Sequence, residues 1–139
     1  MSNMSKQRVL ILCTGNSARS QMAEGLLRHA GGDRFEVESA GTQPSAVRTE
    51  AILVMREIGI DISGQRSKPV DEFAGQDFDY VLTVCDNAKE SCPVYSGHAV
   101  RRHRNFADPA AVQGPEDQRL KAFRKVRDEI RSYLTSFPE

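Results

Sequence analysis

Short apolar runs alternate with helical patterns along this chain of 139 residues. Residues 9–12 are all apolar, as in a strand that is buried on both faces, and residues 80–84 form a similar run. Between these runs, apolar residues recur three or four positions apart at 22–30 and 46–58, which is typical of amphipathic helices. Strands that alternate with helices form right-handed βαβ units, so we expect an α/β fold with a parallel sheet between helices.

Three further segments complete the predicted order of elements. Residues 35–39 alternate as in a second strand, and the polar residues 99–105 are typical of an edge strand. Gly31 and Gly32 are expected to end the first helix. A last helix is predicted from apolar residues spaced three or four apart, namely Leu120, Phe123, Val126, Ile130, Leu134 and Phe137. Because no repeat or linker is visible, we expect one domain over residues 1–139, with four parallel strands and helices on both faces.

The charge balance excludes several classes of protein. Nineteen basic and nineteen acidic side chains cancel, so the chain lacks the positive field on which nucleic-acid and membrane-surface binders depend. No apolar run approaches the roughly 20 residues that span a bilayer. The apolar residues 9–13 are too few for the core of a signal peptide. We expect a cytoplasmic monomer with no membrane or nucleic-acid partner.

The loop after the first predicted strand combines a thiol with groups that bind anions. Cys13 ends the strand, and Arg19 follows it six positions later, at the start of a helix. Free backbone N–H groups at a helix N-terminus, together with a guanidinium, form a site for a tetrahedral oxyanion and lower the pKa of a neighbouring thiol. Asn16 tolerates the left-handed conformation that such a turn needs, and Ser20 can donate a hydrogen bond to the sulfur. The residues predict a nucleophilic Cys13 in an oxyanion loop.

The other two cysteines follow the strand at 80–84. Because the carboxyl ends of parallel strands meet at one edge of a sheet, Cys85 is expected near Cys13. The polar residues 86–91 could form a short helix that is capped by Asp86 and ends near Cys92. Seven helical residues span roughly 10.5 Å, which exceeds the about 4.4–6.8 Å between the Cα atoms of a disulfide. Cys85 and Cys92 can therefore join only if this segment unwinds.

These motifs resemble a known family. Residues 13–20 resemble the phosphate-binding loop of low-molecular-weight protein tyrosine phosphatases, and the longer run 13–25 resembles their relatives, the thioredoxin-coupled arsenate reductases. The resemblance continues through residues 38–42, 59–63 and 126–130, through Cys85 and Cys92, and through Asp108-Pro109. It covers nearly the whole chain.

The resemblance implies reduction of arsenate to arsenite for arsenic detoxification. Cys13 would attack arsenic while Asp108 protonates the departing oxygen, and Cys85 and then Cys92 would carry the disulfide outward to thioredoxin, with no bound cofactor or metal. Phosphate and sulfate would compete as oxyanions. The implied oxyanion-binding residues are Thr14, Gly15, Asn16, Ser17, Ala18, Arg19 and Ser20. The implied supports of the loop are Asn16, Ser20, Glu24, Ser39 and Lys68.

Three positions depart from the family pattern. Ala18 stands where many relatives have a further Cys, so that thiol is not required here. Lys68 stands at the Asp position of a potassium site found in some relatives, so its ammonium would supply the charge and turnover should depend little on potassium. Arg104 replaces an aromatic residue before the Asp108 loop, which leaves the packing of that loop open.

Two other functions compete with arsenate reduction. Cys13, Arg19 and Asp108 would suffice for a phosphatase, although Ala110-Ala111 stands where phosphatases place an aromatic residue that grips the substrate. A non-catalytic sensor could instead bind arsenite or zinc through three thiolates. No two cysteines have the usual spacing of metal ligands. His29, His98 and His103 are scattered and are expected to have surface or packing roles.

Overall fold

A computed structural model describes residues 6–85 and 99–138 and contains one parallel sheet in the order β2-β1-β3-β4. The central strand β1 (Gln7–Cys13) pairs with β2 (Phe35–Gly41) and β3 (Tyr80–Thr83), and β4 (Val100–His103) pairs with β3. The predicted four-stranded parallel sheet is confirmed, with the polar strand at an edge. No helix in the described part of the chain is long and apolar enough to cross a bilayer.

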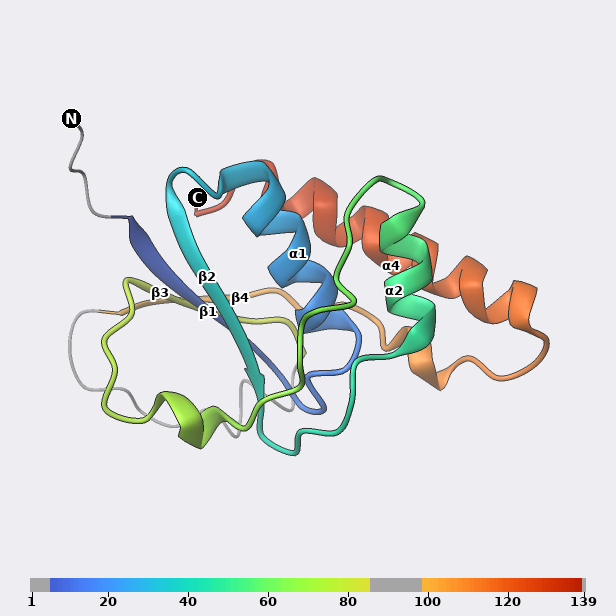
Figure 1. Cartoon of the computed structure of the whole chain (residues 1–139), viewed down its shortest axis with the longest axis horizontal. Helices are drawn as coiled ribbons and strands as arrows, with labels where there is room; N and C mark the ends of the chain where they lie inside the picture. Colours follow the sequence, from blue (N-terminus) through green and yellow to red (C-terminus); the bar gives the residue numbers. More distant parts are fainter. Residues whose placement is uncertain (1–5, 86–98, 139) are drawn as a thin grey trace.

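Helical elements cover the sheet. Helix α1 (Arg19–Gly31) packs on β1 and β2, and α2 (Thr49–Arg56) and α4 (Glu116–Leu134) pack on α1 and on each other. Figure 1 shows the sheet between these helices and the segment that carries the 3-10 helix η1 (Val70–Phe73). A second 3-10 helix, η2 (Pro109–Ala111), contacts α4. Since successive strand residues point to opposite faces, the complete burial of residues 9–12 shows that both faces are covered.

Two predicted helices have different bounds in the structure. Helix α2 begins at Thr49 rather than near residue 46, because residues 42–48 form a strap whose backbone N–H groups bond to the loop after β1. It ends at Arg56, and Gly59 then takes the positive φ of 81° that turns the chain. Helix α4 ends at Leu134, so Phe137 lies beyond it and is buried by tertiary packing. The helix predicted at 86–91 lies outside the described residues.

Different kinds of residue lie at the carboxyl ends and at the amino ends of the strands. At the carboxyl ends, β1 stops at Cys13, β2 at Gly41, and Cys85 lies two residues beyond β3. At the amino ends, Phe137 makes edge-to-face contacts with the rings of Phe35 and Tyr80. The cysteines and the aromatic cluster around Phe137 therefore lie at opposite ends of the strands.

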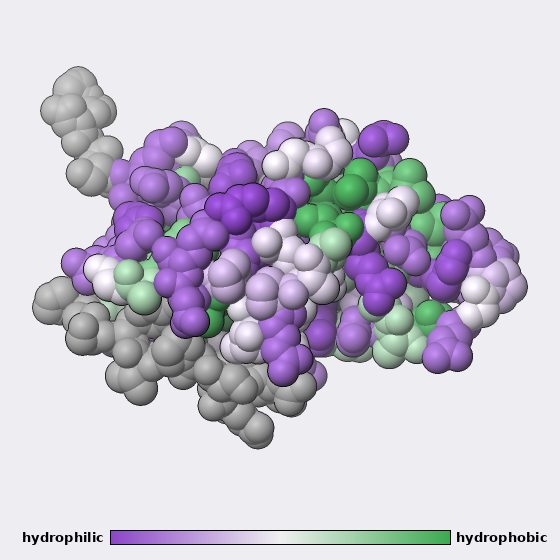
Figure 2. Space-filling model, turned by 60° about the horizontal axis from the view of Figure 1, so that its bottom comes forward, coloured by the Kyte–Doolittle hydropathy of each residue, from purple (hydrophilic) through white to green (hydrophobic). Residues whose placement is uncertain are grey.

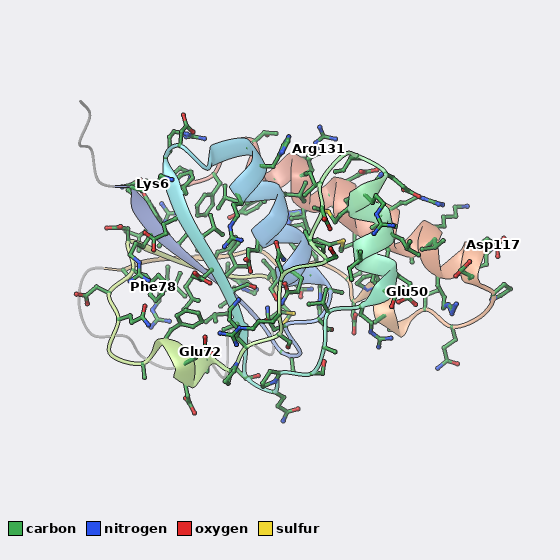
Figure 3. The ribbon with its side chains drawn as sticks, in the orientation of Figure 1. Lys6, Glu50, Glu72, Phe78, Asp117 and Arg131 are labelled. Atoms are coloured by element: carbon green, nitrogen blue, oxygen red, sulfur yellow. The ribbon has the colours of Figure 1, made fainter. Side chains whose placement is uncertain are left out.

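Helix α4 carries charges that match its dipole. Its first turn is acidic and its last turn is basic, and Figure 3 shows Asp117 and Arg131 at opposite ends of the helix. Negative charge near the N-terminus and positive charge near the C-terminus both stabilise a helix.

Candidate active site

Residues 14–18 form a tight loop between β1 and α1, as the sequence predicts. The carbonyl groups of residues 13–18 all accept hydrogen bonds from outside this loop. The donors are Thr42 N to Cys13 O (3.3 Å), Gln43 N to Thr14 O (2.8 Å), Ser45 N (3.1 Å) and Ser67 Oγ (3.0 Å) to Gly15 O, Gln21 Nε2 to Asn16 O (3.0 Å), Arg48 N to Ser17 O (2.9 Å) and Met22 N to Ala18 O (2.9 Å).

The N–H groups of the loop point in the opposite direction from these carbonyl groups. In a planar trans peptide, the N–H of one residue points opposite to the carbonyl of the residue before it. The N–H groups of residues 14–19 therefore point away from the strap and the other donors. Successive N–H groups at the start of a helix form a concave site for an anion. In the view of Figure 2, hydrophilic residues cover most of the described surface, and hydrophobic residues gather in a patch at the upper right.

Asn16 is the residue that makes the turn possible. It has a positive φ of 47°, which confirms the predicted left-handed position, whereas Gly15 is not left-handed. The fully buried Asn16 side chain donates to Ser20 Oγ (2.8 Å) and Ser39 Oγ (2.9 Å), and its Oδ1 accepts from the Lys68 backbone N–H (2.8 Å). The expected hydrogen bond from Ser20 to the Cys13 sulfur is not among the contacts of the described residues.

Gly41 is required by close packing at the end of β2. A Cβ atom at this position would lie 2.5 Å from the Thr14 carbonyl oxygen and 2.9 Å from the Asn16 nitrogen. Both are backbone atoms of the loop and cannot move away without breaking it. The strand end therefore presses directly against the loop.

A buried charge cluster lies behind the loop and includes the predicted supports Glu24, Ser39 and Lys68. Ser39 Oγ donates to Glu24 Oε1 (2.5 Å), and Arg28 contacts Glu24 Oε2 (2.9 Å). The Lys68 ammonium lies 3.8 Å from Glu24 and 3.6 Å from Glu38. Only 7% of the Lys68 side chain is exposed, so its charge is held among carboxylates in a largely dry site.

Arg19 is held by the segment that follows the edge strand β4. Its Nη1 donates to the Phe106 carbonyl (3.0 Å), and its Nη2 lies 3.9 Å from Asp108 Oδ2. Asp108 caps η2 by accepting a hydrogen bond from Ala110 N (3.0 Å), and its side chain is 46% exposed. The packing of this loop, left open by the sequence, is now defined, because the Arg104 guanidinium lies 5.1 Å from the centre of the Phe106 ring.

Cys13 and Cys85 are brought together, as the sequence predicts. Both are buried thiols that are not joined in a disulfide; the Cys13 side chain interacts with Cys85, and Thr14 Oγ1 lies 3.4 Å from Cys85 Sγ. Cys92 lies outside the described residues. Of the histidines that are expected to have surface or packing roles, His103 bonds through Nδ1 to Thr83 Oγ1 (2.6 Å), and His98 lies outside the described residues.

The expected lowering of the Cys13 pKa is wrong for this arrangement. Interaction with Cys85 and burial raise the pKa of the Cys13 thiol above its ordinary value. The Arg19 charge and the Thr14 backbone N–H lower this pKa, but their effect is smaller. The sequence could not show that a second thiol contacts the first, and two adjacent thiols titrate as a pair.

Comparison with known proteins identifies the fold family. Residues 8–139 match the model of the family described as low molecular weight phosphotyrosine protein phosphatase. The chain belongs to this family. Among its relatives, arsenate reductases of Shouchella clausii (strain KSM-K16) and Bacillus subtilis (strain 168) are each 42% identical over 136 residues, which is 98% of this chain and 98% of theirs.

Solved structures of the family superpose on the chain. An arsenate reductase in the phosphate binding state has a TM-score of 0.70 at 33% identity and covers 93% of this chain and 94% of its own. A low molecular weight protein tyrosine phosphatase from T. tengcongensis has a TM-score of 0.76 at 29% identity, with coverage of 94% and 96%. A thioredoxin-dependent arsenate reductase of Corynebacterium glutamicum has a TM-score of 0.69 at 26% identity, with coverage of 97% and 63%.

Several groups at the site are not evident in the sequence. The strap of residues 42–48 and the Phe106 carbonyl act through backbone atoms, which every residue carries. Gln21 and Ser67 act through side chains, but nothing in their spacing shows which carbonyl they meet. The sequence signal for Gln21 is its position in the first turn of α1, one residue after Ser20.

Proposed function

We propose that this chain reduces arsenate to arsenite through a relay of three thiols that thioredoxin resets. The observation that carries the proposal is that Cys85 lies beside the oxyanion loop: Cys13 and Cys85 follow the ends of the paired parallel strands β1 and β3, and Cys85 Sγ is 3.4 Å from Thr14 Oγ1. A phosphatase of this family needs one thiol, whereas a reductase needs a second thiol within reach of the first. The family relatives named as arsenate reductases support this reading.

Arsenate binding is the first step. Arsenate is a tetrahedral anion like phosphate, and the N–H groups of residues 14–19 with the Arg19 guanidinium would hold its oxygens. The Phe106 carbonyl accepts a hydrogen bond from Arg19 Nη1 (3.0 Å) and so limits the movement of the guanidinium. Phosphate and sulfate have the same shape and should compete for the loop.

Covalent attack on arsenic follows. The Cys13 thiol passes its proton to an oxygen of the bound arsenate and forms a sulfur–arsenic bond, and an arsenate hydroxyl leaves as water after taking a second proton from Asp108. Asp108 is suited to this role by position, because it lies beside Arg19 and its side chain is half exposed at the mouth of the site. The arsenic remains in its oxidised state in this adduct.

Electron transfer occurs when Cys85 attacks the Cys13 sulfur. The sulfur–sulfur bond forms, the sulfur–arsenic bond breaks, and its electron pair leaves with arsenic as arsenite. Cys92 then attacks Cys85, so that Cys13 is freed as a thiolate and a Cys85–Cys92 disulfide remains. Thioredoxin supplies two electrons and two protons to restore both thiols. Because free thiols must persist between turnovers, we propose a reducing, cytoplasmic location.

A coupled assay tests the proposal. Purified protein is mixed with thioredoxin, thioredoxin reductase and NADPH, and arsenate is added while NADPH oxidation is followed. Arsenate should start NADPH oxidation, and one arsenite should appear per NADPH consumed. No oxidation with arsenate, together with hydrolysis of p-nitrophenyl phosphate, would favour the phosphatase.

The Cys92→Ser variant tests the order of the relay. It should release one arsenite per chain and then stall, because the Cys13–Cys85 disulfide has no third thiol to accept it. Intact mass spectrometry should then show the loss of two hydrogens. Continued turnover by this variant would mean that the order is wrong, and retention of arsenic without a disulfide would favour a thiol sensor.

A further inference from the structure

Gln21 is a fully buried polar side chain in the first turn of α1. A buried amide destabilises a fold unless its donors and acceptor are hydrogen-bonded. Gln21 is bonded at every polar atom of its carboxamide, and its partners come from the oxyanion loop and from residues 65 and 66. None of the steps of the proposed reaction uses the Gln21 side chain.

The orientation of the Gln21 carboxamide follows from its partners. Its Nε2 lies 3.0 Å from the carbonyl oxygen of Asn16 and 3.0 Å from that of Arg66. Since a carbonyl oxygen can only accept, the NH₂ group must face both of them. Gln21 Oε1 in turn accepts from Gln65 Nε2 (2.7 Å), which also donates to the Gln21 backbone carbonyl (3.1 Å). Gln65 therefore locks the side chain in this orientation.

The Asn16 carbonyl is where this side chain matters. Gly15 O receives bonds from Ser45 N, Ser45 Oγ and Ser67 Oγ, so that peptide has several supports. In contrast, the hydrogen bond that Asn16 O accepts within the described part of the chain comes from Gln21 Nε2. The peptide between Asn16 and Ser17 also follows a residue with positive φ, where the backbone is least favourable for a side-chain-bearing residue.

We propose that Gln21 is a positioning residue that directs the Ser17 N–H toward the bound oxyanion. By holding the Asn16 carbonyl outward, Gln21 fixes the opposite end of the same planar peptide inward. The inference rests on the oxyanion site of the proposed function, and it adds a side chain that sets the geometry without touching the substrate.

Phosphate binding to the loop gives a direct test with Gln21→Met, which keeps the length of the side chain and removes both donors. Bound phosphate should shield Cys13 from iodoacetamide, and mass spectrometry of the Cys13 peptide gives the Kd. The variant should bind phosphate about tenfold more weakly, because a misdirected N–H loses a hydrogen bond to a charged group. Gln118→Met, on the exposed surface of α4, is the matched control and should keep the Kd of the unchanged protein.

Each outcome has one meaning. If Gln21→Met lowers the Tm but binds phosphate with unchanged Kd, Gln21 only stabilises the fold and the inference is overturned. If phosphate fails to shield Cys13 even in the unchanged protein, the oxyanion site of the proposed function fails instead.

Gln65→Met keeps the inference testable if Gln21→Met does not fold. This change leaves the two donor bonds of Gln21 in place and removes the group that fixes its Oε1. The Kd for phosphate should rise about threefold, as expected for a looser but intact contact. An unchanged Kd in this variant would also overturn the inference.

Discussion

The neighbouring thiol of Cys85 raises the pKa of the Cys13 thiol. Contact with Cys85 is the largest cause of the raised pKa of Cys13, ahead of burial. Replacing Cys85 with Ala removes that cause and leaves the lowering effects of Arg19 and the Thr14 N–H in place. The pKa of Cys13 should fall, so a larger fraction is thiolate at neutral pH.

The measurement is the rate of Cys13 alkylation by iodoacetamide as a function of pH, in a Cys92→Ser background. Cys85→Ala should shift the midpoint to lower pH and speed alkylation several-fold at pH 7. Thr14→Val, which keeps both sulfurs and removes the hydroxyl near Cys85, is the control and should shift the midpoint less. A midpoint that moves to higher pH in Cys85→Ala would contradict the claim that Cys85 raises the pKa of Cys13.

Lys68 is the other residue whose surroundings predict a measurable property. Its ammonium lies between Glu24 and Glu38 behind the oxyanion loop, where it supplies a fixed positive charge. We predict that turnover in potassium and in sodium buffers of equal ionic strength differs by less than about twofold, since the screening by the two salts is equal. A large stimulation by potassium would show that the ammonium does not replace an ion.

At the scale of elements, the short helix α2 depends on α4. Only eight residues long and without a side-chain cap, α2 receives a hydrogen bond at the Val54 carbonyl from Arg127 Nη1 (2.8 Å). The same Arg127 bonds to Glu57 Oε1 (2.9 Å), just beyond the end of the helix. A buried arginine thus joins α4 to the C-terminal end of α2.

Arg127→Met should lower the free energy of unfolding by roughly 2 kcal/mol, because the Val54 carbonyl loses its buried donor. Urea denaturation at pH 7 measures this change. Arg124→Met is a matched control, since Arg124 pairs with the same Glu57 on the exposed surface and should cost less than about 1 kcal/mol. Equal losses in both variants would mean that the carboxylate, not the carbonyl, is the important partner.

At the scale of the whole molecule, a cluster of aromatic residues that stabilises the fold and the residues of the site lie at opposite ends of the strands. Phe137 lies at the amino ends of the strands, where it is 3% exposed and packs on Phe35 and Tyr80. The oxyanion loop lies at the carboxyl ends. The core between them is one continuous cluster of buried side chains.

Phe137→Ala should therefore destabilise the protein without changing its site. The loss of a buried ring costs about 3–5 kcal/mol, measured by urea denaturation. The Kd for phosphate, measured in the folded protein, should stay within about twofold of the original value, because sites that share no contacts act independently. A much higher Kd would show that the amino and carboxyl ends of the strands are energetically coupled.

The chain order of the elements could be predicted because each element carries a local pattern. The apolar run at 9–12, the alternation at 35–39 and the helical spacing at 120–134 all respond to burial of one or two faces. The beginning of α2 could not be predicted in this way, because the strap at 42–48 contains residues that fit a helix but bonds to the loop instead. Phe137 fits the helical spacing, yet it packs beyond the end of α4.

For the site, the sequence by itself determined which groups are available: a thiol and a guanidinium on one strand-to-helix turn, a second thiol after a neighbouring strand, and a carboxyl in a later loop. Their chemistry resides in side chains whose identity is local information. Only the tertiary structure decided that Cys85 contacts Cys13 and raises its pKa, that Phe106 holds Arg19, and that Gln21 and the strap turn the loop carbonyls outward. These contacts join residues that are distant in the chain, or depend on backbone groups that every residue shares, so no local pattern can specify them.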